Sequence, residues 1–177
     1  QVQWSPDDTP SQRSAFVRVW TDDGLYGIGE ASPMQGGIAS LLMIQHDIAP
    51  ALIGADPLDY AVLQDRLTHK LVKLGPEGAL TGALAAVDIA LWDIKGKAHG
   101  VPVYQLLGGR CRDKIRVYLG TGGGTPAEAA ASATDAVRQG FTAIKMSPFP
   151  AGPEKMPWAQ VLKGAAAKLE AVRRGVV

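Results

Sequence analysis

The sequence offers little sulfur or imidazole chemistry, since it contains one cysteine, Cys111, and three histidines among 177 residues. A single thiol excludes an internal disulfide framework and CxxC metal clusters. The histidines His46, His69 and His99 lie far apart along the chain, so they predict no metal-binding motif. A Gly-x-Ser-x-Gly element is also absent, and with it the support for a serine nucleophile.

Long apolar runs and an excess of charge of one sign are missing as well. Eighteen basic and seventeen acidic side chains nearly cancel, and no basic stretch is interleaved with aromatics, which argues against a nucleic-acid partner. No run of about 18 apolar residues occurs, so we expect no membrane span. The polar opening, residues 1–13, lacks the order of a signal peptide. We therefore expect a globular, cytoplasmic protein.

The first part of the chain carries clear strand and helix patterns. Residues 15–20 and 25–30 read as two strands, and the Asp-Gly pair between them supplies the positive φ that a tight hairpin turn needs. Apolar residues three or four apart then predict three helices, over residues 38–53, 58–71 and 81–99.

One acid, Asp88, lies within the apolar stripe of the helix over 81–99. A buried carboxylate has to be hydrogen-bonded or paired, so we expect Asp88 to be a structural tether rather than a catalytic group. Asp93 and Lys97 look like an ordinary exposed pair one helical turn apart.

After Gly109 the pattern changes to strand, helix, strand, helix, which is typical of a parallel sheet built from βα units. We place a domain boundary near residue 110, with an α+β domain over 1–110 and an α/β region over 111–177. The elements expected in this second region are strands over 115–119 and 141–147 and helices over 126–139 and 157–174.

The glycine-rich loop at residues 120–125 follows a strand and precedes a helix, as a phosphate-binding loop does. Thr125, however, replaces the third glycine of the GxGxxG motif, and no Gly-Lys-Ser/Thr ending is present. The loop therefore predicts no nucleotide site.

Lys145 stands near the carboxyl end of the strand over 141–147. Strand alternation places it on one face with Phe141, Ala143 and Ser147. If that face lines a barrel, the lysine is partly desolvated and suited to act as a general base. The alternative is a strand-end lysine that extends into water.

Two segments carry a resemblance to a known family. The segment 86–109 reads AVDIALWDIKGKAHGVPVYQLLGG, and it closely resembles the helix and connector that join the two domains in the enolase superfamily, in its mandelate racemase and muconate lactonizing branch. The upstream segment 21–31, TDDGLYGIGEA, is similar to the hairpin of that family's capping domain.

The resemblance implies an α+β capping domain followed by the first two βα units of an incomplete (β/α)8 barrel. Chemistry in this fold takes place at the carboxyl ends of the barrel strands. The resemblance also implies Mg²⁺, which binds the carboxylate of a small-molecule substrate while a base removes the adjacent α-proton.

The second barrel strand of many members carries Lys-x-Lys, and Lys145 matches the first of these lysines. Ser147 stands where the second, proton-abstracting lysine would be, so Lys145 and Ser147 are the candidate catalytic residues. A serine with no visible base partner is a poor proton acceptor. This departure favours an acid-sugar dehydratase resembling galactonate dehydratase over a racemase or cycloisomerase, which stays the alternative.

The family's capping domain places two loops over the barrel mouth. They match residues 4–14 and 31–38, which makes substrate-binding candidates of Trp4, Ser32, Met34 and Gln35. The expected partner is a sugar acid, and we expect the protein to form a homo-oligomer.

The family's metal ligands lie at the ends of the third, fourth and fifth barrel strands, and the chain stops where the third would begin. We therefore predict no metal ligand within these residues. We also expect a fragment of a longer enzyme, since the chain starts with Gln rather than Met, and we expect it to be inactive alone because it lacks the metal ligands. The other hypothesis is a non-catalytic capping or interaction module that associates through its open sheet edge.

Overall fold

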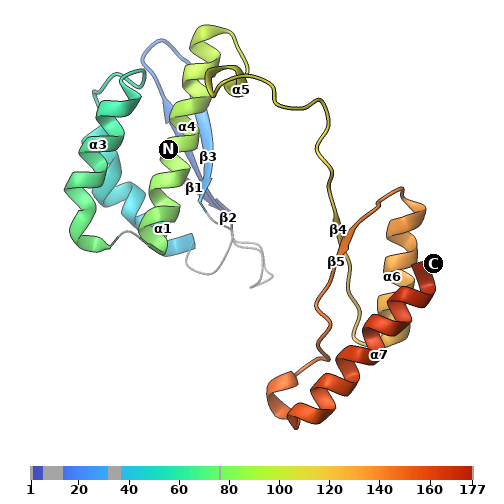
Figure 1. The fold of residues 1–177 in the computed structure, drawn as a ribbon. Helices are drawn as coiled ribbons and strands as arrows, with labels where there is room; N and C mark the ends of the chain where they lie inside the picture. The colour runs from blue at the N-terminus through green and yellow to red at the C-terminus, as the bar shows by residue number, and fades with distance from the viewer. Residues whose placement is uncertain (1, 6–13, 32–36, 76, 177) are drawn as a thin grey trace. The chain divides into compact units, whose positions relative to one another are not determined.

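The computed structural model describes residues 2–5, 14–31, 37–75 and 77–176, with side chains from residue 15 onward. The chain divides into two compact units, Gln1–Cys111 and Arg112–Val177. Each unit has its own buried apolar cluster, one on the hairpin and its helices and one between two later helices. Figure 1 shows the elements of both units.

The first unit contains a three-stranded antiparallel sheet in the order β1 (Val2–Ser5), β2 (Ser14–Trp20) and β3 (Tyr26–Ala31). The backbone N–H of Thr21 donates to the carbonyl of Leu25 across the turn at 2.9 Å, and Gly24 has a positive φ of 89°. The hairpin predicted from the Asp-Gly pair is therefore confirmed.

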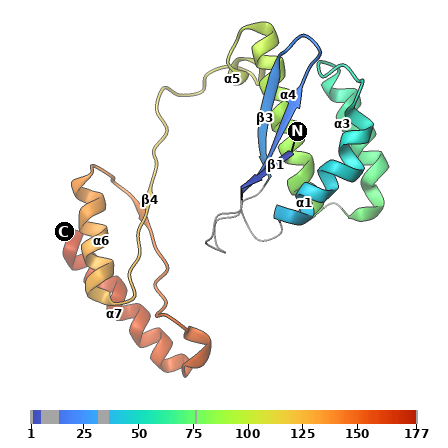
Figure 2. The same cartoon turned by 180° about the vertical axis from the view of Figure 1, so that it is seen from behind.

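The helix α4 (Ala79–His99) crosses the sheet and covers one of its faces, as Figures 1 and 2 show. Its approach is unusually close at β3, where a Cβ added to Gly29 would lie 1.8 Å from the carbonyl oxygen of Ala86. At Gly27 the corresponding distance, to the carbonyl oxygen of Ala90, is 1.9 Å. The helix backbone thus rests on a strand surface that has no side chains at these two positions.

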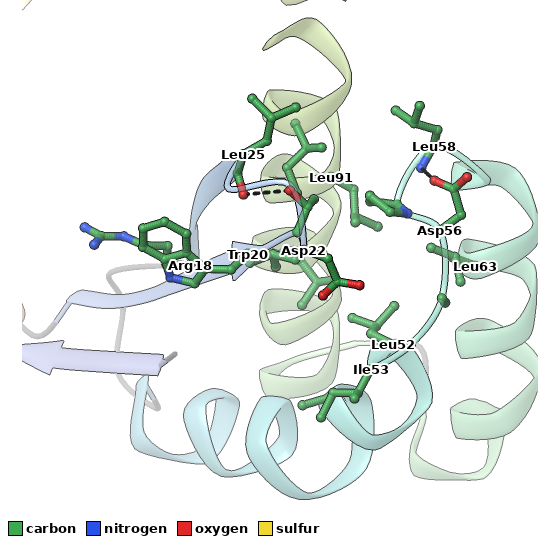
Figure 3. A pocket seen from close by; sticks show the side chains of 18 of the residues that line it. Arg18, Trp20, Asp22, Leu25, Leu52, Ile53, Asp56, Leu58, Leu63 and Leu91 are labelled. Atoms are coloured by element: carbon green, nitrogen blue, oxygen red, sulfur yellow. Dashed lines mark hydrogen bonds between the residues drawn. The ribbon is translucent and has the colours of Figure 1, made fainter. Parts of the chain in front are cut away.

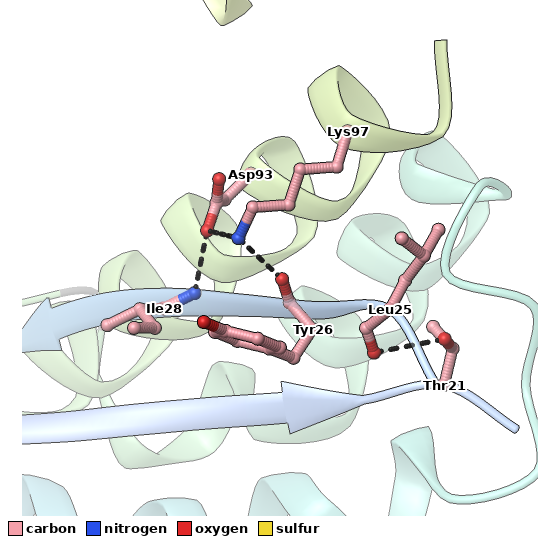
Figure 4. A network of polar contacts seen from close by, with 6 residues as sticks. All are labelled: Thr21, Leu25, Tyr26, Ile28, Asp93 and Lys97. Carbon is pink, nitrogen blue, oxygen red and sulfur yellow. Dashed lines mark hydrogen bonds and ion pairs between the residues drawn. The ribbon is translucent and has the colours of Figure 1, made fainter. Parts of the chain in front are cut away.

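Asp93 and Lys97 bind the free edge of β3, as Figure 4 shows. Asp93 Oδ2 accepts a hydrogen bond from the backbone N–H of Ile28 at 3.0 Å, and Lys97 Nζ donates to the carbonyl of Tyr26 at 2.7 Å. The two side chains also pair with each other at 2.8 Å. The expectation of an ordinary exposed pair was incomplete, because these charges satisfy edge groups that would otherwise be open to another strand.

The helix predicted over 38–53 is interrupted. The structure has α1 (Gly37–Met43), a π-helical turn (Ile44–Ile48) and α2 (Ala49–Leu52). The N–H of Ala49 donates to the carbonyl of Ile44, five residues earlier. Pro50 explains the break, since it has no N–H and its ring would clash with the carbonyl four residues before it in a regular α-helix.

The helix α3 (Tyr60–Leu71) is tied to α4 through Asp88, as predicted for a structural tether. Asp88 Oδ1 accepts hydrogen bonds from the Tyr60 hydroxyl at 2.5 Å and from Gln64 Nε2 at 2.6 Å. Tyr60 also packs on Trp92, with ring centroids 4.8 Å apart. Two short helices complete the first unit, a 3-10 turn (Val72–Leu74) and α5 (Val103–Leu106).

The Tyr60 hydroxyl should contribute to stability in a pH-dependent way. Burial, and then the hydrogen bond to Asp88, raise the pKa of Tyr60 above its usual value of 10.0. Because the folded state favours the protonated hydroxyl, its contribution is complete below pH 10 and is lost as the pH rises through the raised pKa. We expect Tyr60→Phe to lower the free energy of unfolding by about 1–2 kcal/mol at neutral pH.

Urea denaturation of wild type and Tyr60→Phe at neutral pH, and again above the raised pKa, tests this expectation. The difference between the two proteins should shrink at the alkaline pH. Tyr104→Phe is the matched control, because Tyr104 is exposed. A difference that stays constant across the pH range would show that the Tyr60–Asp88 bond does not carry the effect.

The second unit has the order β4 (Leu119–Gly120), α6 (Pro126–Arg138), β5 (Ile144–Lys145), a 3-10 turn (Pro153–Lys155) and α7 (Trp158–Val176). The two strands pair in parallel, with Leu119 opposite Ile144 and Gly120 opposite Lys145. Both predicted helices are present within two residues of their expected ends. Thr125 and Glu128 form a capping box at the start of α6.

Both strands are much shorter than the ranges 115–119 and 141–147 that the sequence predicted. Where the second strand was expected to begin, the N–H of Phe141 donates to the carbonyl of Ala136 at 3.1 Å, so this residue is still bound to the end of α6. The carbonyl and the hydroxyl oxygen of Thr142 accept hydrogen bonds from Arg116 Nη2 and Nε, at 2.9 and 3.3 Å. A backbone group that a longer β5 would use is therefore taken by the preceding helix.

Candidate functional site

The candidate site lies at the carboxyl ends of β4 and β5. The N–H of Leu119 donates to the carbonyl of Ala143 at 3.1 Å, and the N–H of Thr121 donates to the carbonyl of Lys145 at 2.9 Å. Since parallel strands end at the same edge of a sheet, the two loops that follow them start next to each other. Thr121 and Lys145 therefore stand side by side at this edge.

Lys145 projects from the face of the sheet opposite its packed side. Ile144 and Met146 pack against the cluster that α6 and α7 form, so strand alternation directs Lys145 away from these helices. Its ammonium nitrogen lies 5.9 Å from the ring centroid of Tyr118, and the side chain is exposed. The partial desolvation that the sequence argument considered for a barrel interior is thus not found within this chain.

Ser147 is exposed two residues beyond Lys145, immediately before Pro148. The structure brings the two candidate catalytic residues to the same strand end. Among the described residues no side-chain hydrogen bond reaches the Ser147 hydroxyl, so no general base is in place to activate it. This edge of the sheet therefore offers two functional groups, the ammonium of Lys145 and the hydroxyl of Ser147.

Thr121 is a third polar residue at this edge, and sequence reasoning missed it. Its Oγ1 atom is buried and has no hydrogen-bond partner among the described residues. Buried hydroxyls are normally bonded, so this oxygen has an unmet hydrogen bond directly after β4. The available signal was its position, since it is the first residue beyond a parallel strand.

Lys168 on α7 was also missed. It is only 4% exposed, and its Nζ donates to the carbonyl oxygens of Gly123 at 3.0 Å and Phe149 at 2.9 Å. Helical spacing could have found it, because it lies on the same stripe as the buried residues Val161, Ala165 and Val172.

The predicted substrate-binding residues of the first unit are not assembled by the structure. Trp4 lies in β1, paired in register with Ala15, and its side chain is outside the described part. Ser32, Met34 and Gln35 fall outside the described residues. Their roles remain predictions.

The first unit also contains an apolar cavity of about 740 Å³ between the hairpin turn, the α2–α3 connection and α4. Figure 3 shows Leu52, Leu63 and Leu91 around it, with the carboxylate of Asp22 directed inward. Two other carboxylates line the cavity and are already bonded: Asp56 accepts from the N–H of Leu58 at 2.8 Å, and Asp23 accepts from the Thr21 hydroxyl. Asp22 has no hydrogen-bond partner among the described residues, and one such carboxylate in an apolar hollow suits binding rather than acid–base chemistry.

The described residues offer no ligand set for a metal ion. Among their histidines, cysteines, aspartates and glutamates, no three side chains come together. These residues therefore do not fit a magnesium site.

Comparison with known proteins identifies the family. The model of the mandelate racemase / muconate lactonizing enzyme N-terminal domain matches residues 2–108. The chain belongs to this family, within the enolase superfamily. The match covers the hairpin, the helices α1 to α4 and the connector through α5, and it includes the segments 21–31 and 86–108 that carried the resemblance.

Individual relatives agree with the family. A D-galactonate dehydratase from Verminephrobacter eiseniae is 44% identical over 138 residues, which are 76% of this chain and 35% of that protein. A mandelate racemase/muconate lactonizing protein from Paracoccus denitrificans, solved in complex with magnesium, is 44% identical with a TM-score of 0.80. A member of the enolase superfamily from Salmonella Typhimurium is 31% identical with a TM-score of 0.84.

The solved structures are matched by nearly all of this chain but are much longer. The Paracoccus match covers 99% of this chain and 47% of that one, and the Salmonella match covers 94% and 48%. The chain thus spans about a third of the length of its curated relatives and just under half of the solved chains. Within the described residues, no helix has the length and hydropathy to cross a membrane.

Proposed function

We propose that this chain supplies the capping domain and the first two βα units of the barrel of a Mg²⁺-dependent acid-sugar dehydratase. The observation that carries the proposal is the parallel pairing of β4 with β5, which puts Lys145 at a strand's carboxyl end. Barrel enzymes place their chemistry at that end. The family membership and the D-galactonate dehydratase relative support the same reading.

The reaction removes water from a polyhydroxy acid. A base takes the α-proton, and the electron pair of that C–H bond forms a carbon–carbon double bond as the β-hydroxyl leaves. An acid protonates the departing hydroxyl to give water, and the resulting enol tautomerises to a 2-keto-3-deoxy acid. Negative charge builds up on the substrate carboxylate during proton removal, so a nearby cation lowers the barrier.

Lys145 is suited to that task. Its ammonium group projects from the end of β5 and, among the described residues, is not bound to any carboxylate. Ser147 offers a hydroxyl that can bind a substrate oxygen, without acting as the base. The proton-abstracting group and the metal ligands would come from other parts of the longer enzyme, outside these 177 residues. The 177-residue chain alone should therefore be inactive.

A chimera tests this proposal. The chain replaces the matching segment of the Verminephrobacter eiseniae D-galactonate dehydratase, and water loss from D-galactonate and other hexonates is measured with Mg²⁺ present. We expect turnover by the chimera and none by the 177-residue chain. A folded chimera without turnover on any hexonate, or turnover by the chain alone, contradicts the proposal.

The same assay in deuterated water distinguishes the alternative chemistry. A racemase or cycloisomerase of this superfamily would exchange the α-proton of recovered substrate without releasing water. Deuterium wash-in with no keto product would therefore replace the dehydratase proposal by that alternative.

A further inference from the structure

Lys168 is a buried cation that touches both loops of the candidate site. Gly123 belongs to the loop between β4 and α6, and Phe149 to the loop between β5 and α7. The Lys168 ammonium donates to one backbone carbonyl in each loop, at 3.0 and 2.9 Å. One side chain on a third element therefore connects the two segments that leave the carboxyl edge of the sheet.

Contacts other than the one with Lys168 also restrain the loop after β4. A Cβ at Gly123 would lie 2.5 Å from the backbone nitrogen of Ala129, so the loop fits tightly against the first turn of α6. Glu128 Oε2 accepts from the N–H groups of Gly124 at 2.8 Å and Thr125 at 3.1 Å. The Gly123 carbonyl is thereby aimed at Lys168 from a fixed backbone.

The loop after β5 has fewer attachments. Phe149 stands between two prolines, which cannot donate backbone hydrogen bonds. Its carbonyl binds Lys168, and its ring lies 6.5 Å from the ring centroid of Trp158. Ser147 is only two residues away, so the position of its hydroxyl depends on how Phe149 is held.

Burying an ammonium group costs free energy, so filling space in the core does not by itself explain why Lys168 stands here. The other buried members of this α7 stripe are alkyl side chains, and a methionine would fill a similar volume. No carboxylate among the described residues pairs with Lys168, and its hydrogen-bond partners there are the two carbonyl oxygens. A positive group thus lies below an edge where the proposed substrate is an anion.

We propose that Lys168 is a positioning residue, which holds the two carboxyl-end loops in the arrangement that presents Lys145 and Ser147 to the substrate carboxylate. This inference rests on the proposed function for its catalytic consequence. The structural link between the loops stands on the geometry of this chain alone, so the two parts can be tested separately.

The first experiment uses the 177-residue chain and NMR. In Lys168→Met we expect the carbonyl ¹³C resonances of Gly123 and Phe149 to move upfield, as a lost hydrogen bond requires. Amide exchange of Gly124 and Thr125 should rise at least tenfold, while α6 and α7 keep their protection. Lys163→Met, an exposed lysine on the same helix, is the control and should change none of these signals.

Conservative variants keep this test decisive if Lys168→Met fails to fold. Lys168→Arg retains a charged donor group that can reach both carbonyls, so both resonances should stay close to wild type. Lys168→Gln has a neutral donor on a side chain one bond shorter than lysine, so at least one resonance should shift. Unchanged carbonyl resonances in Lys168→Gln, or an equal loss of protection throughout α6, α7 and the loops, would overturn the positioning role.

The second experiment places Lys168→Met in the chimera described above. Because small misplacements of reacting groups cost up to about a hundredfold in rate, we expect kcat to fall at least tenfold with KM changed less than threefold. A role in stability alone would lower the melting temperature and leave kcat per folded molecule unchanged, which would overturn the catalytic part. A wild-type chimera without activity would reject the proposed function, and the NMR result would still decide the link between the loops.

Discussion

Replacing Gly29 with alanine is expected to destabilise the first unit by about 3 kcal/mol or more. The new Cβ would lie 1.8 Å from the carbonyl oxygen of Ala86 and 3.1 Å from the N–H nitrogen of Ala90. Both atoms belong to the backbone of α4, so no side-chain rotation can relieve the clash. Either the helix moves off the sheet or β3 loses its pairing with β2, and both changes expose the core around Val87 and Leu91.

Urea denaturation followed by tryptophan fluorescence measures this loss, and hydrogen exchange locates it. Protection should fall in β2, β3 and α4, while the second unit serves as an internal reference. Glu30→Ala is the matched control, because Glu30 lies next to Gly29 in the same strand but is exposed. A Gly29→Ala protein as stable as Glu30→Ala would mean that α4 does not rest on β3 as described.

Replacing Lys145 with alanine is expected to lower kcat of the chimera by about a hundredfold or more while leaving its stability unchanged. Removing one group that stabilises developing negative charge commonly costs ~10²–10³ in rate. The fold should tolerate the change because the side chain is exposed, and β5 is held through its backbone, including the bond from Thr121 N–H to the Lys145 carbonyl.

The comparison that decides this prediction is between activity and stability. Lys155→Ala removes another exposed lysine of the same unit and should leave both unchanged. Lys145→Arg keeps the charge on a larger group and should retain more activity than Lys145→Ala. Matching losses of activity and stability in Lys145→Ala would support the other reading of this lysine, a strand-end side chain with no part in the reaction.

The two predictions concern different halves of the chain and fail independently. Gly29 tests how the capping domain is built, since its effect is confined to the contact between β3 and α4. Lys145 tests the proposed chemistry, since its side chain contributes little to packing. A defect in one leaves the measurement on the other intact.

Local patterns were enough to predict several elements. The hairpin follows from an Asp-Gly pair between two alternating segments, and α4 follows from apolar residues three or four apart. These signals act over a few neighbouring residues, so tertiary contacts did not override them. The family resemblance came from the same two segments, the hairpin and the helix with its connector, and the family model confirms it.

The sequence predicted less well those elements in which a different hydrogen-bonding pattern replaces the regular one of a helix or strand. The helix over 38–53 breaks because Pro50 forces a π-helical turn, a consequence that apolar spacing does not register. In the second unit, the N–H of Phe141 binds the carbonyl of Ala136 at the end of α6, so β5 does not begin where the sequence pattern predicted. In both cases a local hydrogen-bonding constraint outweighed the periodicity of the segment.

The sequence by itself determined the kind of elements, their order and the family, because these depend on side-chain periodicity and turn residues. Apart from Asp88, whose tether role the sequence predicted, only the tertiary structure decided what the polar residues do. Asp93 and Ile28 are 65 residues apart in the sequence, and Lys168 and Gly123 are 45 apart. Residues so far apart in the sequence come together only when packing brings the ends of the intervening segment into contact. No local sequence pattern specifies such pairs. The edge protection of β3 and the link between the two site loops are therefore properties of the folded chain.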